Sequence, residues 1–321
     1  MRLNWIIRPF EDRDYQTVPG LLNAIWPDEV HSEAAMREDD RDRDLRCKTE
    51  RFIAEVEGRV VGYGLYDQFE GMYHPQKFSA WVSVHPEFRD GGIGQRLWER
   101  VWAALQPHMP ISILSSTRED QAPALHLLAK YGFEEKMRSW ESRLDVRAFD
   151  LAAHAGRMEA VEVAGFALRS LAELGGNEEA YRKAYDLWLE TRADVPRPEP
   201  MSEVSYENWL RWTVESPYYL PEANFVAVDT ATGAFVAQSN LWKTDGEYLQ
   251  VGLTGTRRAY RRRGLALALK LKAIEYAKAA GATELRTGNE QNNRPMLAIN
   301  ERLGFVKQPA WIDFVKRLET P

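Results

Sequence analysis

Two glycine-containing segments with the same residue pattern are the clearest candidates for a ligand site. Residues 89–94 read RDGGIG and residues 261–266 read RRRGLA, so both fit Arg-x-x-Gly-x-Gly/Ala. A Gly-Phe pair follows each segment, at Gly132 and at Gly304. Both landmarks recur 172 residues apart, with no gap between them. A repeat of this kind predicts a tandem duplication of one structural unit.

The chemistry that such a segment can perform is phosphate binding. Glycines between a strand and a helix let the backbone approach a ligand, and the first helical turn offers N–H groups without partners inside the helix. The helix dipole adds positive potential there, so the segment suits a pyrophosphate. Neither a Gly-Lys-Ser/Thr loop nor a dinucleotide fingerprint in a parallel unit fits the chain. The competing interpretation is a glycine turn that binds nothing.

The elements that would hold these segments also repeat. Each half begins with an apolar strand, followed by a helical stretch and an antiparallel hairpin with a glycine-containing turn. Another strand leads into each glycine segment, and apolar residues at helical spacing follow from Ile93 and from Leu265. The predicted strands are 5–10, 51–56, 60–65, 80–84 and 111–114, then 163–171, 224–228, 234–238, 249–254 and 284–287. A further helix precedes each Gly-Phe, and a last strand holds Trp140 or Trp311.

With these motifs the chain resembles the GNAT acetyltransferase superfamily over nearly its whole length. The family's motif Gln/Arg-x-x-Gly-x-Gly/Ala is matched at both segments, and its closing Leu-Gly-Phe at 303–305 and approximately at 131–133. The second half is similar to the C-terminal half of two-unit members such as mycothiol synthase. The implied fold class is α+β, with two tandem GNAT-like units, each a central mixed, mostly antiparallel sheet flanked by helices. We predict units at 1–144 and 162–321, joined by a connector at 145–161.

The resemblance implies acetyl-CoA as the cofactor, without a metal, and transfer of its acetyl group to an amine. The strand before each motif would offer backbone N–H groups to the pantetheine arm and the thioester oxygen. The predicted cofactor-binding residues are Leu253, Thr254, Thr256, Arg261, Arg262, Arg263, Gly264, Leu265, Ala266, Asn289 and Asn293, with Val84, Arg89, Gly91, Gly92 and Gly94 in the first half. The first copy is the weaker match because Asp90 stands where the second has Arg262. We therefore predict that the second unit is catalytic.

Acid and base candidates are few in the second half. Many family members have a tyrosine four residues before the Gly of Gly-Phe, which protonates the departing thiolate, but this chain has Leu128 and Asn300 there. Asn300 can hydrogen-bond the sulfur but cannot protonate it. All 6 histidines precede the second unit, so a base would be a carboxylate, a water or a group of the N-terminal half. Glu247, at the start of the strand before the motif, is either this base or an ordinary carboxylate at a sheet edge.

The predicted partner is a small amine. Acids and aromatics alternate between residues 185 and 212, which suits a cationic amine, although an amphipathic helix with a solvated acidic face has the same pattern. A net charge of −6 and a pI of about 5.7 argue against nucleic-acid binding. We expect neither a signal peptide nor a membrane span, and an incidental role for the single cysteine, Cys47. We therefore expect a cytoplasmic protein that is a monomer or a homodimer.

The alternative class is a binding protein, such as an acyl-CoA sensor or a scaffold, whose units keep CoA sites but catalyse nothing. The absence of tyrosine at positions 128 and 300 favours this alternative. The complete motif at 261–266 and the pair Asn289 and Asn293 favour the enzyme. Release of CoA in the presence of candidate amines separates the two classes.

Overall fold

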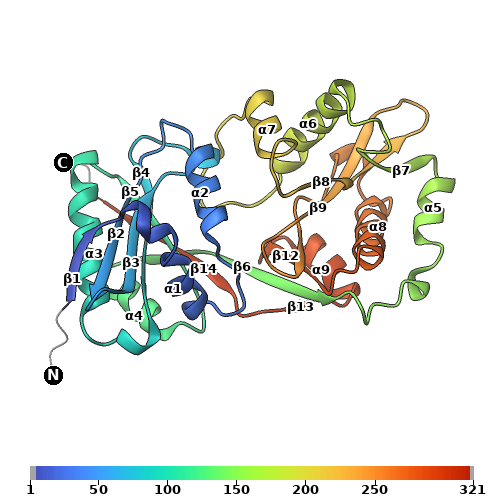
Figure 1. Ribbon diagram of the computed structural model, residues 1–321. Helices are drawn as coiled ribbons and strands as arrows, with labels where there is room; N and C mark the ends of the chain where they lie inside the picture. The colour runs from blue at the N-terminus through green and yellow to red at the C-terminus, as the bar shows by residue number, and fades with distance from the viewer. Residues whose placement is uncertain (1–4, 319–321) are drawn as a thin grey trace. The chain divides into compact units, whose positions relative to one another are not determined.

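The computed structural model describes residues 5–318 and divides into two units that are discontinuous in sequence (Figure 1). Unit 1 consists of residues 5–138, 198–202 and 311–318, and unit 2 of residues 139–197 and 203–310. This division differs from the predicted one, because the last strand of each half belongs to the other unit. The predicted ends at 1–4 and 319–321 lie outside the described residues.

Unit 1 is a mostly antiparallel sheet in the order β1-β2-β3-β4-β5-β14, with β4 and β5 parallel. Its strands are β1 (Trp5–Pro9), β2 (Glu50–Val56), β3 (Arg59–Asp67), β4 (Lys77–Val84), β5 (Ser112–Arg118) and β14 (Trp311–Arg317). Its helices are α1 (Val18–Ile25), α2 (Glu33–Asp42), α3 (Ile93–Leu105) and α4 (Ala122–Lys130). Short 3₁₀ turns are η1 (Asp12–Tyr15), η2 (Glu70–Met72), η3 (Pro86–Phe88) and η4 (Gln106–His108).

Helix α3, which follows the first glycine segment, lies close to the sheet because two glycines on β3 make room for it. A Cβ added at Gly62 would lie 2.8 Å from Leu97 Cδ1, and one at Gly64 would lie 3.2 Å from Val101 Cγ2. Leu97, Val101 and Leu105 are fully buried in the core of unit 1. Side chains at these glycines would push the helix off the sheet and displace the glycine segment at its start.

Unit 2 repeats this plan in the order β6-β12-β10-β9-β8-β7, with β10 and β12 parallel. Its strands are β6 (Glu134–Asp145), of which residues 139–145 belong to this unit, β7 (Phe166–Ser170), β8 (Tyr219–Asp229), β9 (Phe235–Trp242), β10 (Tyr248–Val251), β11 (Gly255–Thr256), β12 (Glu284–Glu290) and β13 (Val306–Lys307). Its helices are α5 (Arg157–Val163), α6 (Glu178–Arg192), α7 (Tyr206–Trp212), α8 (Leu265–Ala279) and α9 (Arg294–Arg302), with turns η5 (Ala152–His154) and η6 (Arg258–Tyr260). The predicted fold class is confirmed in both units.

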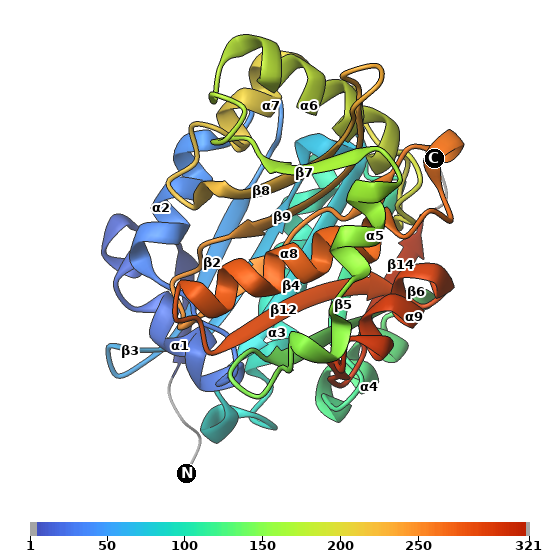
Figure 2. The same cartoon turned by 90° about the vertical axis from the view of Figure 1, so that its right-hand side faces the viewer.

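The predicted connector is part of unit 2. Residues 145–161 contain η5 and most of α5. Val161 of α5 is buried in the same core cluster as Leu265 and Leu269 of α8, and the two helices lie side by side in Figure 2. The apolar residues that gave this stretch its helical pattern are therefore packed against the helix that follows the second glycine segment.

The strands that end the two halves are exchanged. Residues 141 of β6 and 313 of β14 are 172 positions apart, so the two strands are equivalent in the repeat. Yet β6 pairs antiparallel with β12 in unit 2, whereas β14 pairs antiparallel with β5 in unit 1. Each sheet is thus completed by a strand from the other half of the sequence.

The two parallel strands of each sheet separate before the glycine segment. β4 pairs with β5 from Lys77 to Ser79, and β10 pairs with β12 from Tyr248 to Val251. Beyond Val251 the chain leaves β12, and β11 pairs with β9 instead. This separation leaves backbone of the preceding strand open beside the glycine turn.

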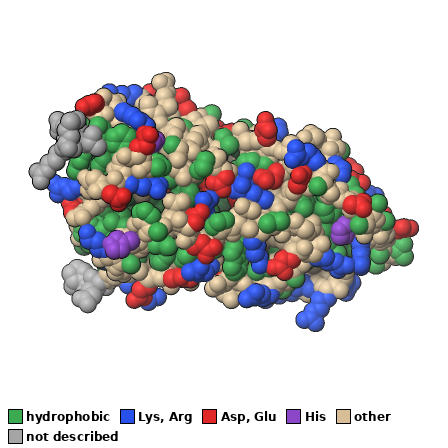
Figure 3. Space-filling view, turned by 90° about the horizontal axis from the view of Figure 1, so that it is seen from below, with side chains coloured by type: hydrophobic (Ala, Val, Ile, Leu, Met, Phe, Trp, Pro, Cys, Tyr) green, Lys and Arg blue, Asp and Glu red, His purple; other side chains and the backbone are tan. Residues whose placement is uncertain are grey.

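Charge is mixed on the face of the molecule seen in Figure 3, where basic and acidic side chains are interspersed. Among residues 5–318, no helix combines the length and the apolar character that crossing a membrane requires.

Candidate functional site

The two glycine segments form the same turn. Gly92 caps the start of α3 and Gly264 caps the start of α8, both with left-handed backbone, at φ 83° and 82°. Asp90 and Arg262 are also left-handed, each with φ 63°. A Cβ strains the backbone at such angles, which explains glycine at the cap. The first residues of each helix keep N–H groups without helical acceptors, as pyrophosphate binding requires.

The arginine that opens each segment is anchored in the same way in both units. Arg89 Nε donates to the Val84 carbonyl, and Arg261 Nε donates to the Thr256 carbonyl, both at 3.2 Å. Donor and acceptor positions each recur 172 residues apart. This bond ties the turn to the strand that leads into it, so four predicted cofactor residues form one repeated local structure.

The remaining residues of the two segments divide between the surface and the core. Arg263 lies over the Tyr260 ring, with its Cζ 5.2 Å from the ring centre, and Leu265 is buried. Ala266 is half-buried and Gly91 is exposed. In unit 1 a Cβ at Gly94 would lie 3.5 Å from Val84 Cγ2, so a larger residue there would crowd the strand.

Carboxylates from α6 and the residues after it face the arginines of the unit 2 turn. Asp194 pairs with Arg258 at 2.7 Å and also with Arg261. Glu190 pairs with Arg257 at 2.5 Å. Hydrogen bonds from Arg258 and then Arg261 hold the pKa of Asp194 below its usual value. Asp194 therefore occupies guanidinium groups that a pyrophosphate would also attract.

Replacing Asp194 with asparagine is expected to tighten acetyl-CoA binding to unit 2 about threefold. The substitution removes two exposed ion pairs, each worth roughly 0.2 to 1 kcal/mol, and releases Arg258 and Arg261. Calorimetry measures the effect, with Glu190→Gln as the matched control, because its partner Arg257 is also held by the Phe235 carbonyl at 2.8 Å. Weaker binding in the Asp194 variant would mean that the carboxylate orders the turn and does not compete with the ligand.

Leu253 and Thr254 lie in the irregular segment between β10 and β11. Thr254 Oγ1 is hydrogen-bonded to Ser239 Oγ at 2.9 Å, which fixes this segment against β9. Gly252 has no space for a side chain, because Asn240 and Trp242 occupy the place of its Cβ. The segment is off the β12 ladder, so its backbone is suited to pair with an extended ligand such as a pantetheine arm.

Asn289 on β12 and Asn300 on α9 meet in unit 2. Asn300 Nδ2 donates to Asn289 Oδ1 at 2.6 Å, and Asn300 is buried. Its Oδ1 has no hydrogen-bond partner among the described residues. Asn293 caps the start of α9 without a side-chain capping bond. The unit 1 residues at the positions of the amide pair are Thr117 and Leu128, which cannot make this contact.

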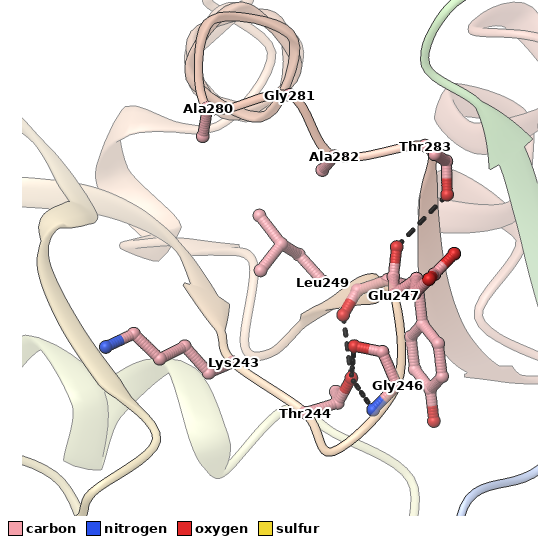
Figure 4. Close-up of a pocket in the computed structure, with 10 residues that line it drawn as sticks. Lys243, Thr244, Gly246, Glu247, Leu249, Ala280, Gly281, Ala282 and Thr283 are labelled. Atoms are coloured by element: carbon pink, nitrogen blue, oxygen red, sulfur yellow. Dashed lines mark hydrogen bonds between the residues drawn. The ribbon is translucent and has the colours of Figure 1, made fainter.

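Glu247 lies in a hollow next to the start of β10 (Figure 4). This end of the strand is the one farther from the glycine turn. The lining residues come from 243–249 and 280–283. Glu247 is exposed, and its backbone carbonyl accepts a hydrogen bond from Thr283 Oγ1 at 3.1 Å. It precedes Val251, the last β10 residue paired with β12, by four positions, which is about 13 Å along a strand. From there its carboxylate would act on an amine between the strands only through water.

The role of Glu247 as the base stays a prediction. If it holds, Glu247→Gln lowers turnover on the order of 10²-fold with little change in acetyl-CoA affinity, because only proton transfer is affected. Steady-state kinetics across pH, combined with calorimetry, measures both quantities. Unchanged turnover and an unchanged pH–rate profile would remove Glu247 from the mechanism.

The aromatic residues between 185 and 212 build a core between α6 and α7. Tyr185, Tyr206 and Trp209 have ring centres 5.4 to 5.9 Å apart. Tyr206 and Trp209 are buried, and the Tyr206 hydroxyl donates to Glu178 at 2.9 Å. These rings pack against one another. An amphipathic helix with a buried aromatic face therefore describes them better than a cation-binding cage does.

Cys47 is buried, and burial raises the pKa of its thiol to about 11. A thiol that stays protonated at neutral pH is a poor nucleophile, because the thiolate is the reactive form. This environment agrees with the incidental role expected for Cys47.

Family models match both parts of the chain. The acetyltransferase (GNAT) domain matches residues 48–135, and the acetyltransferase (GNAT) family matches residues 181–305. Each match contains one glycine segment and one Gly-Phe. The chain belongs to the GNAT acetyltransferase superfamily. It is a tandem member of this N-acetyltransferase family, whose cofactor is acetyl-CoA.

Relatives of known name are distant. A mycothiol acetyltransferase from Thermobifida fusca (strain YX) is 27% identical over 238 residues, 71% of each chain. Another from Nocardioides sp. (strain ATCC BAA-499 / JS614) is 25% identical over 262 residues, 73% of this chain and 83% of the relative. A tandem GNAT protein from the clavulanic acid biosynthesis pathway has a TM-score of 0.73 at 22% identity, covering 98% of both chains. A GCN5-related N-acetyltransferase from Sphaerobacter thermophilus also reaches 0.73, at 20% identity over 98% of this chain and 95% of that one.

Proposed function

We propose that this protein acetylates a small amine and that unit 2 carries the reaction. The observation that carries the proposal is the difference between two turns of the same backbone geometry. At φ 63° unit 2 has Arg262, whereas unit 1 has Asp90. A cation at this position attracts a pyrophosphate and an anion repels it. The amide pair of Asn289 and Asn300 adds a second feature that unit 1 lacks.

Several residues of unit 2 would hold the cofactor. Acetyl-CoA supplies the acetyl group as a thioester. The N–H groups of residues 264–266 and the guanidinium of Arg261 would bind its pyrophosphate, and the backbone of 253–254 would orient the thioester carbonyl. Asn300 would hydrogen-bond the sulfur but cannot protonate it, so water delivers that proton. A carboxylate or a water takes the proton of the attacking amine.

The proposed acceptor is a small molecule with a free amino group. The distant relatives named mycothiol acetyltransferases support a small-molecule acceptor. The buried aromatic core of α6 and α7 gives no support to recognition of the amine by those rings. We propose instead that the amine is recognised at the sheet, where β10 separates from β12.

A binding protein that retains CoA without catalysis is the second candidate function. Leu128 and Asn300 favour it, because neither side chain can act as an acid at the place where many family members have a tyrosine. Such a protein would bind acetyl-CoA tightly and release no CoA with any amine.

The experiment that separates the two functions measures CoA thiol release with a panel of polyamines, amino acids and aminoglycosides. The enzyme is expected to release CoA with at least one amine, in proportion to the amine added. Tight acetyl-CoA binding with no release across the panel would favour the binding protein.

A further inference from the structure

We propose that Glu141, brought into unit 2 by the exchanged strand β6, takes the proton of the acceptor amine. The inference rests on the proposed function, because it assigns a residue to the reaction proposed for unit 2. Glu141 comes from the first half of the sequence, and the strand exchange places it in the sheet of unit 2.

The register of β6 sets Glu141 beside the separation of β10 and β12. Glu141 pairs with Gly288, which directly follows Thr287, the last β12 residue paired with β10. Paired Cα atoms of antiparallel strands are about 5 Å apart. A glutamate side chain is long enough to extend over Gly288 toward the open region on the other side of β12.

Glu141 faces the side of the sheet opposite α8. Leu144 of β6 and its partner Leu285 of β12 are buried in the core cluster that contains α8. Successive strand residues point to opposite faces, so Glu141, three positions from Leu144, lies on the other face. An amine on that face would meet Glu141 without competing for space with α8, whose first turn forms the candidate cofactor site.

Gly288 leaves the space next to Glu141 open. Gly288 is exposed, and an added Cβ would meet no described atom within 4 Å. Arg143 Nε donates to Glu141 Oε1 at 2.6 Å, which fixes the carboxylate and leaves Oε2 without a partner among the described residues. The equivalent pair in unit 1 is Ser116 and Asp313, where the Ser116 hydroxyl donates to the carboxylate. Each carboxylate thus accepts one side-chain hydrogen bond, and only in unit 2 is its cross-strand partner a glycine with open space beside it.

The neighbouring charged side chains of β12 on this face are engaged elsewhere. Arg286 donates to Glu284 at 2.6 Å and lies over the Tyr248 ring, with its Cζ 3.7 Å from the ring centre. Glu290 accepts hydrogen bonds from the backbone N–H and the side-chain amide of Asn292, both at 2.8 Å. Glu141 is thus the carboxylate paired with Gly288, next to the strand separation, where an incoming ammonium group could meet it.

In the proposed step the acceptor's ammonium group gives one proton to Glu141 and becomes a neutral amine. The nitrogen lone pair forms the C–N bond to the thioester carbonyl carbon, and the C–S bond breaks with its electron pair on sulfur. The nitrogen's second proton reaches this thiolate through water. Glu141 then returns its proton to solvent, so one acetamide, one CoA thiol and one free proton result.

The test compares Glu141→Gln with the wild type, using an amine that releases CoA in the panel. We expect kcat/KM for the amine to fall about 10²-fold while KM for acetyl-CoA changes little. Asp313→Asn, at the equivalent position of unit 1, is the matched control and is expected to keep its activity.

Several outcomes would overturn the inference. Wild-type kcat/KM in Glu141→Gln would do so, as would an equal loss in Asp313→Asn or a 10²-fold loss confined to Glu247→Gln. Acetyl-CoA binding by calorimetry reports whether each variant is folded, and Glu141→Asp, which keeps the charge, should lose less than Glu141→Gln. Loss of turnover in Gly264→Asp with wild-type turnover in Glu141→Gln would overturn this inference and leave the proposed function standing. Absence of CoA release with every amine would overturn both.

Discussion

Gly264→Asp is expected to lower turnover and to weaken acetyl-CoA binding to unit 2 by about 10- to 10³-fold. At φ 82° a Cβ costs roughly 1 to 2 kcal/mol. A carboxylate next to a pyrophosphate adds about 1 to 4 kcal/mol of repulsion, depending on how exposed the site is. Aspartate is among the residues that adopt left-handed backbone most readily, so α8 should still form at this modest cost in stability. The larger expected loss is one of binding.

The matched variant is Gly92→Asp, which makes the same change at φ 83° in unit 1. We expect it to keep its turnover, since unit 2 is proposed to be catalytic. Calorimetry gives the affinity and stoichiometry of acetyl-CoA, and thiol release gives turnover. Loss of activity only in Gly92→Asp would reverse the assignment, and loss in both would mean that the units act together. If Gly264→Asp binds acetyl-CoA as tightly as the wild type, the site has been misplaced.

The two glycine variants can be compared directly, because the two turns differ in charge but hardly in backbone conformation. Asp90 and Arg262 have the same φ, and the anchoring bonds of Arg89 and Arg261 have the same length. For exposed groups, an anion in place of a cation at this position changes the binding free energy of the pyrophosphate by about 1 kcal/mol, which is roughly five- to tenfold in affinity. Unit 1 can therefore retain a weak cofactor site, which is compatible with the proposed assignment of catalysis to unit 2.

Most secondary structure could be predicted because its signals are local. The apolar spacing after Leu265 and the stop at Gly281 predict a helix that the structure gives as Leu265–Ala279. The strand exchange could not be predicted in this way. β6 and β14 are equivalent strands, and either could extend β5 or β12. The choice depends on pairing between distant residues, which periodicity does not encode.

In the candidate site, too, features set by neighbouring residues could be predicted, and features set by distant residues could not. The turn at 261–264 was predictable because contiguous residues set its conformation. The family motif indicated Asn289 and Asn300 as separate site residues, and the hydrogen bond between them required the structure. Asp194 belongs to the stretch of acids and aromatics at 185–212, which did not indicate its pairing with the arginines of the turn. Glu141 gave no signal, because it belongs to no motif and reaches the site through tertiary structure. The aromatics near 185–212 left two interpretations open, since alternating acids and rings do not reveal which rings are buried.

Lys270→Met is expected to stabilise the protein by about 2 to 4 kcal/mol at pH 7 and to raise Tm by roughly 5 to 15 °C. Lys270 lies in α8 with 2% exposure, and its Nζ has no hydrogen-bond partner among the described residues. The Nζ is 5.3 Å from the centre of the Phe305 ring. In unit 1 the equivalent position holds Trp98, whose ring packs against Phe133 at 5.4 Å. Methionine fills the lysine's space without burying a charge.

The pKa of Lys270 determines how the stability of the protein should change with pH. Burial lowers the pKa of Lys270 from 10.5 to about 7, so between these values the unfolded chain binds one more proton than the folded chain. Wild-type stability should therefore rise from pH 7 toward 10, by up to about 1.4 kcal/mol per pH unit, and the gain from Lys270→Met should shrink. Thermal unfolding at several pH values measures both trends, with Lys272→Met as the control, because Lys272 is half-buried on the same helix and ion-paired to Glu275 at 3.3 Å. A less stable Lys270→Met variant with the wild-type pH dependence would show that the ammonium is satisfied inside the protein, and unit 2 would then contain a buried polar contact to explain.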